Sequence, residues 1–433
     1  MLYYSTSLKK PGTSLREAVE RGLAPEGGLY MPERFPRIPK AFFKNLPLMS
    51  IHDVGYVVSN LLFGDEISSQ IIKEIVDSAL TFDYPLVEIE KGISSLELYH
   101  GPTLSFKDTG ARFMARLLSK LLPRGERLNV LVATSGDSGG AVSNAFFRLD
   151  NINVYVLFPS GKISRTQQTQ FTTLGSNIHP IEIYGTFDDC QSLVKQAFVD
   201  RDLTSRINLT SANSINIARL FPQSFYYFYG WGQAVRNGAD PDNVVISVPS
   251  GNLGNLTAGL FARRMGLPVK RFIAANNRND IFASFLRDGV YSPRKSVPTI
   301  ANAMDVGNPS NFDRIMDLYG GSADSLRADV EGYTSPDQEI VASIKSLYQR
   351  SGYLMDPHGA TAYNALKNCL RPGETGVFLE TADPSKFPSA IEPIIGHPLP
   401  VPAVVSNRYD RLQRRERIEP KYNQLKNILL KMK

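Results

Sequence analysis

Short apolar runs that alternate with helical patterns most constrain how this chain can fold. Between residues 125 and 210 the runs are Leu128–Ala133, Val154–Phe158, Ile181–Tyr184 and Ile207–Thr210. A second set lies at Val244–Val248, Arg271–Ala275 and Gly376–Leu379. Each run has the length of a buried strand, and this spacing is typical of β-α-β units with parallel strands. We therefore expect an α/β protein with two open, mostly parallel sheets that carry helices on both faces.

The 433 residues leave room for further domains beside the two sheets. Residues 1–85 are helix-rich, with helical patterns at Ser14–Arg21 and Ile67–Leu80. The sequence predicts four regions: an N-terminal domain at 1–85, a large domain from 86–124 and 211–400, a small α/β domain at 125–210, and a basic helical tail at 401–433.

A lysine follows a turn-bounded apolar run in HGPTLSFKDTGAR, residues 100–112. Lys107 stands beside Phe106 and just before a predicted helix at Thr109–Leu122. Most lysines are solvated surface charges, and that interpretation stays open for this one taken alone. The position also suits an amine that forms a Schiff base with a cofactor and must stay in one place.

A second motif, NVVISVPSGNLGNLTAGLFAR at 243–263, is a predicted strand, a Gly/Asn-rich turn and a helix from about Leu256. Gly251 and Gly254 allow the backbone to approach a ligand closely, and N–H groups at a helix start attract anions. The turn is neither a dinucleotide fingerprint nor a P-loop, so a smaller phosphate ester fits better. An ordinary strand-to-helix turn is the alternative.

A third motif is NVLVATSGDSGGAVSN at 129–144. Its Gly136–Gly140 string matches the nucleophile loop of trypsin-like proteases. The context contradicts a protease, because the string lies between a predicted strand and helix, only His52 and His100 precede it, and the chain has only two cysteines. Its hydroxyl and amide groups suit an amino-acid carboxylate instead.

A tethered lysine, a phosphate cradle and a hydroxyl-rich turn together indicate pyridoxal 5'-phosphate chemistry. The chain also resembles the threonine synthase family, which belongs to fold type II of the pyridoxal-phosphate enzymes (the tryptophan synthase β-like fold). The resemblance runs from the N-terminus to about residue 400. It is carried by YYSTS, GLAPEGGLYMP (22–32), HGPTLSFKD, ATSGDSGGAV, FPSGKISRTQQTQFTTLGSNI (158–178), SANSINIARLFPQSFYYF (211–228), SVPSGNLGNLTAG, NAMDVGNPSNFDR (302–314) and ETADPSKF (380–387).

The resemblance implies roles for individual residues. Lys107 would form the Schiff base and shuttle protons, Thr381 would bond the pyridine nitrogen, and Asp137 would lie near the cofactor O3'. The cofactor phosphate would be bound by Ser250, Gly251, Asn252, Leu253, Gly254 and Asn255. The substrate would be bound by Ser135, Gly136 and Ser138 at its carboxylate and by Asn213, Ser214 and Arg219 at its phosphate. An ordinary ion pair is the alternative for Arg219.

The reaction implied is that of a carbon–oxygen lyase that acts on a phosphate ester. O-phospho-L-homoserine and water would give L-threonine and phosphate by γ-elimination and β-addition of water, the last step of threonine biosynthesis. The alternatives are a phospho-lyase or serine/threonine dehydratase-like enzyme that releases 2-oxobutyrate, and a relative that only binds cofactor. Three positions depart from the family pattern: Ser7 replaces an arginine, Ser138 a threonine and Asp383 a histidine.

The net charge of +6 lies in the C-terminal tail, since residues 408–433 hold nine Lys/Arg and three Asp/Glu. The sequence of the tail predicts two short helices separated at Pro420. The helix after Pro420 would carry an apolar face of Leu425, Ile428, Leu429 and Met432. We expect this face to dock on the body of the protein, and polyanion binding is the alternative.

Partners other than a small-molecule substrate are not expected. No stretch approaches the roughly 20 apolar residues of a membrane span. The start MLYYSTSLKKPG lacks a signal-peptide core, and the two cysteines have no paired spacing. His100, His179 and His358 show no metal-ligand spacing. The sequence therefore predicts a cytoplasmic monomer or homodimer without metal, nucleic-acid or membrane binding.

Overall fold

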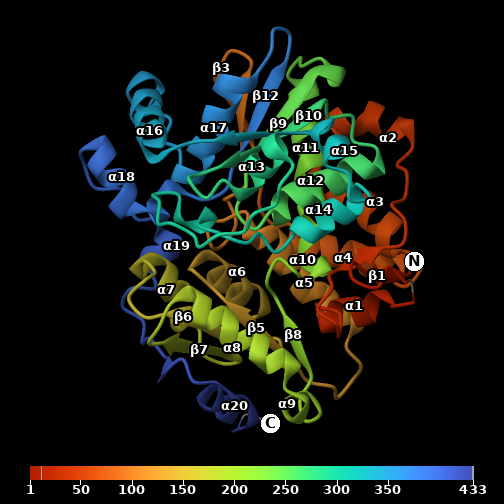
Figure 1. The fold of residues 1–433 in the computed structure, drawn as a ribbon, viewed down its shortest axis with the longest axis vertical. Coiled ribbons are helices and arrows are strands. Elements are labelled where there is room, and N and C mark those ends of the chain that lie inside the picture. Colours follow the sequence, from red (N-terminus) through yellow and green to blue (C-terminus); the bar gives the residue numbers. More distant parts are fainter. Residues whose placement is uncertain (11, 432–433) are drawn as a thin grey trace. The chain divides into compact units, whose positions relative to one another are not determined.

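The computed structural model describes residues 1–10 and 12–431, and it divides into two compact units (Figure 1). The first unit consists of Met1, residues 31–106 and residues 220–400. The second consists of residues 2–30, residues 107–219 and the chain from Val401 on. Each unit is built on one sheet, and we describe each by itself.

The sheet of the first unit has six strands in the order β11-β10-β9-β12-β4-β3. All neighbours are parallel except the antiparallel pair β3 and β4. The strands are β3 (Leu86–Glu90), β4 (Ile93–Glu97), β9 (Val244–Pro249), β10 (Arg271–Asn276), β11 (Val330–Thr334) and β12 (Thr375–Glu380).

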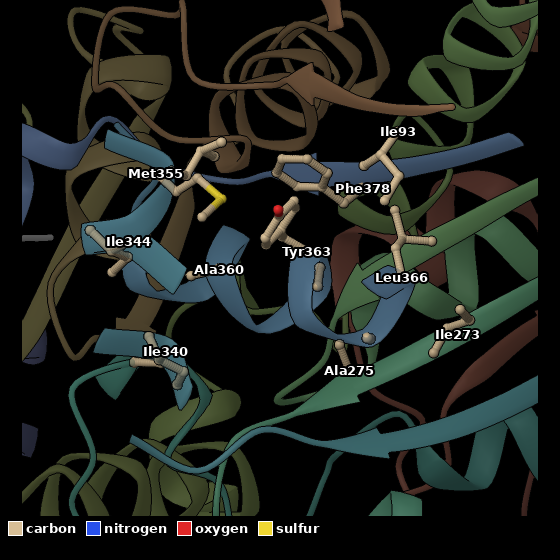
Figure 2. Close-up of a cluster of buried hydrophobic side chains, with 14 of the residues drawn as sticks. Ile93, Ile273, Ala275, Ile340, Ile344, Met355, Ala360, Tyr363, Leu366 and Phe378 are labelled. Atoms are coloured by element: carbon tan, nitrogen blue, oxygen red, sulfur yellow. The ribbon is translucent and has the colours of Figure 1, made fainter. Parts of the chain in front are cut away.

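Helices cover both faces of this sheet. On one face, Ile273 and Phe378 join a cluster with side chains of α16 (Asp337–Ser351) and α17 (Pro357–Cys369), as Figure 2 shows. On the other face, Phe272 touches α12 (Gly254–Met265), where a Cβ on Gly259 would lie 2.9 Å from its ring. The remaining helices of this unit are α2 (Lys40–Asn45), α3 (Ile51–Phe63), α4 (Ser69–Ala79), α11 (Gln223–Arg236), α13 (Ile281–Asp288), α14 (Phe312–Leu318), α15 (Ala323–Arg327) and α18 (Pro388–Ile395), with 3-10 turns η1 (Leu46–Leu48), η2 (Pro241–Asn243), η3 (Asn302–Met304) and η4 (Pro384–Lys386).

The sheet of the second unit has five parallel strands in the order β13-β7-β6-β5-β8. They are β5 (Leu128–Ala133), β6 (Ile152–Pro159), β7 (Ile178–Ile183), β8 (Leu209–Ser211) and β13 (Glu416–Ile418). Leu131 and Leu157 face α8 (Phe187–Val199) and α20 (Tyr422–Lys431). Val156 faces the opposite helix α6 (Asp137–Phe146), where a Cβ on Gly139 would lie 2.9 Å from it.

The other elements of the second unit are β1 (Tyr3–Ser5), α1 (Leu15–Arg21), α5 (Lys107–Leu121), α7 (Arg165–Thr172), α9 (Arg201–Thr204) and α19 (Ala403–Ser406), with β2 (Tyr30–Pro32) and α10 (Ile217–Leu220) at its borders. Ser14 caps α1, because its side chain accepts a hydrogen bond from the Glu17 amide. The predicted fold class, two open and mostly parallel sheets with helices on both faces, is confirmed. No helix among the described residues is long and apolar enough to cross a membrane.

The tail differs from the prediction of two short helices. The segment just before Pro420 forms the strand β13, which pairs with β7, instead of a helix, while α20 follows Pro420 and the short α19 lies earlier in the tail. The edge of β7 offers unpaired backbone groups, and pairing with them outweighs the weak local helix signal. Leu425, Ile428 and Leu429 are buried as expected, while Met432 lies outside the described residues.

The two units do not coincide with the four predicted regions. Helix α5 groups with the second unit because it packs against α6, and Arg116 donates a hydrogen bond to the carbonyl of Ala145 at 2.8 Å. Residues 2–30 group with the same unit because α1 packs against β8. The limits of the four predicted regions therefore remain a prediction.

Candidate active site

The turn between β9 and α12 is a row of backbone donors. Among residues 1–10 and 12–431, no acceptor is found for the N–H groups of Gly251, Asn252 and Leu253. Gly254 and Asn255 begin α12, where N–H groups have no acceptor within the helix. Five consecutive N–H groups and the positive end of a helix therefore remain for an anion.

Two features hold this turn in shape. Leu253 adopts the left-handed conformation at φ 61°, which is rare for a residue with a side chain, and its side chain is buried. A Cβ on Gly251 would lie 2.9 Å from Cα of Met304, so only glycine permits this approach. The helix begins at Gly254 rather than near Leu256, and two more residues of the motif thereby belong to its first turn.

Thr381 follows the carboxyl end of β12 and is 5% exposed. Within the part of the chain that the structure describes, no residue hydrogen-bonds its hydroxyl. Its carbonyl accepts the N–H of Phe106 at 2.9 Å, and Ala382 forms a β-bridge with Ser105. The turn after β12 is thereby fixed to the segment that leads into Lys107.

In the second unit, Lys107 begins α5 and Asp137 begins α6. The Lys107 Nζ lies 3.6 Å from Oδ2 of Asp137, and their side chains are 18% and 4% exposed. The other carboxylate oxygen, Oδ1, accepts a hydrogen bond from Gln167 Nε2 at 2.9 Å. Asp137 is therefore held in place while one of its oxygens faces the lysine.

The turn before α6 presents hydroxyl groups around these residues. Gly136 has φ 137°, and a Cβ there would lie 2.5 Å from the Gln167 carboxamide. The Thr134 hydroxyl accepts N–H bonds from Gly136 at 2.9 Å and Gly139 at 2.8 Å. Ser135 is exposed and Ser138 is half-buried, so both hydroxyls are accessible.

Asn213, Ser214 and Arg219 lie beyond the end of β8 in the same unit. Asn213 donates to the carbonyl of Ala133 at 3.0 Å, which ties it to the turn that holds Ser135. Arg219 is 3% exposed and donates to the carbonyl of Ala212 at 2.5 Å. Burial lowers the pKa of Arg219 to about 10, while Asp108 opposes this shift. A buried guanidinium of this kind gains stability from a bound anion.

Sequence reasoning missed a buried polar group beside Thr381. The Asp356 carboxylate faces Nδ1 of His358, and Glu380 Oε1 accepts the N–H of Asp356 at 2.5 Å. Burial, followed by the charge of Asp356, raises the pKa of Glu380 well above its usual value. The adjacency of Glu380 to Thr381 in ETADPSKF was the one available signal.

The predicted site residues thus fall into two sets. The first unit holds the Ser250–Asn255 turn and Thr381, and the second holds Lys107, the Ser135–Ser138 turn, Asn213, Ser214 and Arg219. Sequence reasoning also missed Gln167, although its place three residues after the capping Ser164 is a helix-start signal. No group of three or more His, Cys, Asp or Glu among the described residues could hold a metal ion.

A surface cavity of about 290 Å³ lies at the opposite edge of the second sheet. It is lined by Asn129 and Asn153 near the amino ends of β5 and β6, whereas Ser135 follows the carboxyl end of β5. None of the predicted site residues lines it, and open α/β sheets bind ligands at their carboxyl edges.

The donor set fits pyridoxal 5'-phosphate. The five N–H groups of the turn after β9 suit a phosphate group, and the Thr381 hydroxyl suits a ring nitrogen. Backbone N–H groups and the helix start can bind the phosphate without a cationic side chain.

Comparisons with known proteins agree with this geometry. The family model for pyridoxal-phosphate dependent enzymes matches residues 93–381, and the one for the threonine synthase N terminus matches residues 2–80. The chain is 42% identical to a threonine synthase of Haemophilus influenzae over 431 residues, with 100% of both chains covered.

Two solved structures extend the likeness to the fold. The crystal structure of threonine synthase from Escherichia coli superposes with a TM-score of 0.94 at 39% identity, with 100% of both chains covered. The structure of PLP-bound threonine synthase from Brucella melitensis gives 0.92 at 34% identity, with 99% and 98% covered.

These matches define the class first: the fold and the donor set are those of a pyridoxal-phosphate dependent enzyme of fold type II, and its cofactor is pyridoxal 5'-phosphate. The matches to the N-terminal model and to full-length relatives then narrow the class. The chain belongs to the threonine synthase family of lyases.

Proposed function

We propose that this chain converts O-phospho-L-homoserine and water into L-threonine and inorganic phosphate. The observation that carries the proposal is the pair formed by Lys107 and Asp137, 3.6 Å apart beside a hydroxyl-rich turn. It puts a basic group next to donors that suit an amino-acid carboxylate, in a chain of the threonine synthase family.

In this proposal the cofactor is held at both ends by the first unit. Backbone N–H groups of Gly251–Asn255 bind its phosphate, and the Thr381 hydroxyl bonds its ring nitrogen. The Ser250 N–H is not among these donors, because it already donates to the carbonyl of Ala275 at 2.8 Å. When bound, pyridoxal phosphate supplies a carbonyl for amine attachment and withdraws electrons from the substrate Cα. A hydroxyl partner leaves the ring nitrogen less fully protonated than a carboxylate would, which favours elimination and replacement.

The second unit binds the substrate in the same proposal. Ser135, Gly136 and Ser138 receive the carboxylate, and Asn213, Ser214 and Arg219 receive the substrate phosphate. Arg219 suits that role because a guanidinium bonds two phosphate oxygens at once, and its buried charge is stabilised by the anion.

Lys107 moves the protons. It takes protons from Cα and Cβ, and Asp137, itself fixed by Gln167, orients the ammonium group that results. In the overall reaction the Cγ–O bond to phosphate breaks, Cγ gains the proton that Cβ lost, Cα regains its own proton, and the hydroxyl of water bonds to Cβ while its remaining proton goes to the departing phosphate. Water and substrate thus account for all atoms of threonine and phosphate.

A three-product assay tests this function. Purified protein with pyridoxal phosphate and O-phosphohomoserine should form threonine and phosphate in equal amounts, without 2-oxobutyrate. Phosphate with 2-oxobutyrate would instead indicate a phospho-lyase, 2-oxobutyrate formed from serine or threonine would indicate a dehydratase-like enzyme, and no turnover would indicate a relative that only binds cofactor.

Lys107→Ala should lower kcat by at least about 1000-fold, because a positioned acid–base group contributes about 10²–10⁴ in rate and this lysine also holds the cofactor. Lys120→Ala is the matched control, since Lys120 is an exposed lysine on the same helix. Loss of activity in both variants would reflect damage to α5 instead.

We also propose that the protein works in the cytoplasm as a monomer or homodimer. The sequence argument for the cytoplasm rests on the two unpaired cysteines, which are free thiols in the structure. Light scattering of the purified holoenzyme would test the oligomeric state, and fractionation of cells would test the location.

A further inference from the structure

A continuous series of hydrogen bonds joins the turn after β12 to the turn that touches the phosphate loop. It starts at Ala382, whose N–H donates to Oδ2 of Asp356 at 3.2 Å. Oδ1 of Asp356 accepts from Nδ1 of His358, and Nε2 of His358 accepts the N–H of Ala303 at 3.1 Å. Ala382 adjoins Thr381, and all four residues belong to the first unit.

The far end of this series lies against the phosphate loop. A Cβ on Gly251 would lie 2.9 Å from Cα of Met304 and 3.3 Å from the carbonyl oxygen of Ala303, so the two backbones are in direct contact. The same segment also bonds the loop further on, since Asn311 donates to the carbonyl of Asn252 at 3.1 Å.

The hydrogen bonds define which nitrogen of His358 carries the proton. A backbone N–H can only donate, so Nε2 accepts from Ala303 and the proton lies on Nδ1, which faces Asp356. Asp356 also caps α17 by accepting the N–H of His358 at 2.7 Å. The ring therefore has one orientation that satisfies both neighbours.

Asp356 and His358, which form the centre of this hydrogen-bond series, are held in place by the packing around them. Asp356 is fully buried and His358 is 3% exposed. Met355 precedes Asp356 and Ala360 follows His358 in the sequence, and both of these side chains lie in the apolar cluster of Figure 2. The His358 ring also packs against Phe387, with the ring centres 4.9 Å apart.

We infer that Asp356 and His358 are positioning residues that set the spacing between the Thr381 hydroxyl and the phosphate loop, so that both ends of one cofactor molecule are bound at once. The inference rests on the proposed roles of Thr381 and Ser250–Asn255. Two joined binding groups reinforce each other only where the protein matches their spacing.

The phosphate contribution to binding provides a readout that does not depend on turnover. For each variant we measure the Kd of pyridoxal phosphate and the Kd of pyridoxal, which lacks the phosphate. The Kd of pyridoxal divided by the Kd of pyridoxal phosphate gives the contribution of the phosphate group to binding. His358→Phe keeps a ring against Phe387 but removes both hydrogen bonds. We expect this variant to lower the ratio at least about 10-fold, mainly through weaker binding of pyridoxal phosphate.

His358→Asn is the milder variant, because its amide can still donate to Asp356 while the bond to Ala303 is lost. It should lower the ratio by a similar factor and keep the apoprotein folded if His358→Phe does not fold. His397→Phe is the matched control, since His397 is exposed and bonds only Tyr348 and the Pro398 carbonyl among the described residues. The control should leave the ratio unchanged.

A ratio that stays at the wild-type value in His358→Asn would overturn the inference, as would equal losses of affinity for both ligands, which indicate a merely structural role. Failure of wild-type protein to bind pyridoxal phosphate more tightly than pyridoxal would also overturn it. Wild-type protein that shows the phosphate contribution but forms no threonine would overturn the proposed function alone.

Discussion

Glu380 is a buried carboxyl group whose charged neighbours are themselves acidic. Asp356 and Glu97 both raise its pKa in addition to burial, and no donor among the described residues reaches its Oε2. A proton on Glu380 satisfies that oxygen and removes the repulsion. The folded protein therefore holds this proton at pH values where the unfolded chain has lost it.

Glu380→Gln should consequently change the pH dependence of stability. A raised pKa contributes stability that is complete below the unfolded value near 4.3 and is lost as pH rises, by up to about 1.4 kcal/mol per pH unit. The neutral amide avoids this loss, so the variant should become more stable relative to wild type as the pH rises from 5.5 to 8, by at most about 1.4 kcal/mol per pH unit.

Urea unfolding of both apoproteins at the two pH values would measure this gain. Glu88→Gln, an exposed position on the same sheet, should follow the wild-type pH dependence. Parallel pH profiles for wild type and Glu380→Gln would show that Glu380 is ionised in the folded state.

Single residues were predictable where a motif surrounds them, and unpredictable where a contact joins distant segments. Lys107, the turn after β9 and the Ser135–Ser138 turn stand in local patterns of strand, glycine and helix start. His358 showed no such pattern, because its partner Ala303 lies 55 residues away and the bond uses a backbone N–H. Their roles in binding and catalysis stay predictions.

Helix α20 is the element that fixes the tail to the second unit. Its buried residues Leu425, Ile428 and Leu429 join the apolar cluster of α8 and the sheet. Two ion pairs border it, since Lys426 Nζ lies 2.7 Å from Asp200 and 2.9 Å from Asp202. The helix is thus held by packing, with charges at its rim.

Leu425→Ala should lower the free energy of unfolding by about 2–5 kcal/mol, the usual cost of removing a fully buried leucine side chain. Asn427→Ala, on the exposed side of the same helix, should change it by less than about 0.5 kcal/mol. Guanidinium denaturation measures both. Equal small effects would show that α20 is not docked in solution.

Strands were predictable where their sequence is a nearly continuous apolar run. Burial alone was not enough, because β4, with the sequence ISSLE, is mostly buried and was missed. β5 was predicted with its observed limits, and β9, β10 and β12 to within one residue at each end, because all four are nearly continuous apolar runs. β3 and β11 were missed because most of their residues are only half-buried, and their sequences LVEIE and VEGYT carry no strong pattern. β13 was missed because its short sequence, ERI, carries no strand pattern, and it is extended only because it pairs with β7.

At the scale of the whole molecule, part of the positive charge of the tail is paired within the second unit. Arg415 and Arg417 both bind Glu182, at 2.7 and 2.9 Å, and Arg408 donates to Asn144 at 2.9 Å. These cations are occupied by partners within their own unit. The balance of 48 basic and 42 acidic residues is otherwise close to even.

The holoenzyme should therefore bind duplex DNA more weakly than a Kd of about 10⁻⁴ M at physiological salt, the weak end of nonspecific binding. Fluorescence anisotropy with a labelled duplex of random sequence, repeated at low salt, measures this affinity. Micromolar binding that declines steeply with salt would instead support the polyanion alternative for the tail.

The second unit is assembled from three separate parts of the chain, and its edge strand β13 begins 233 residues after the end of its neighbour β7. On a ribosome, at about 5–20 residues per second, the edge of β7 has to wait roughly 10–50 s for β13 to be synthesised. Until then the edge of β7 and the cluster that α20 covers stay open. Nascent and prematurely terminated chains should therefore expose an unpaired strand edge and an uncovered apolar cluster, both of which favour aggregation.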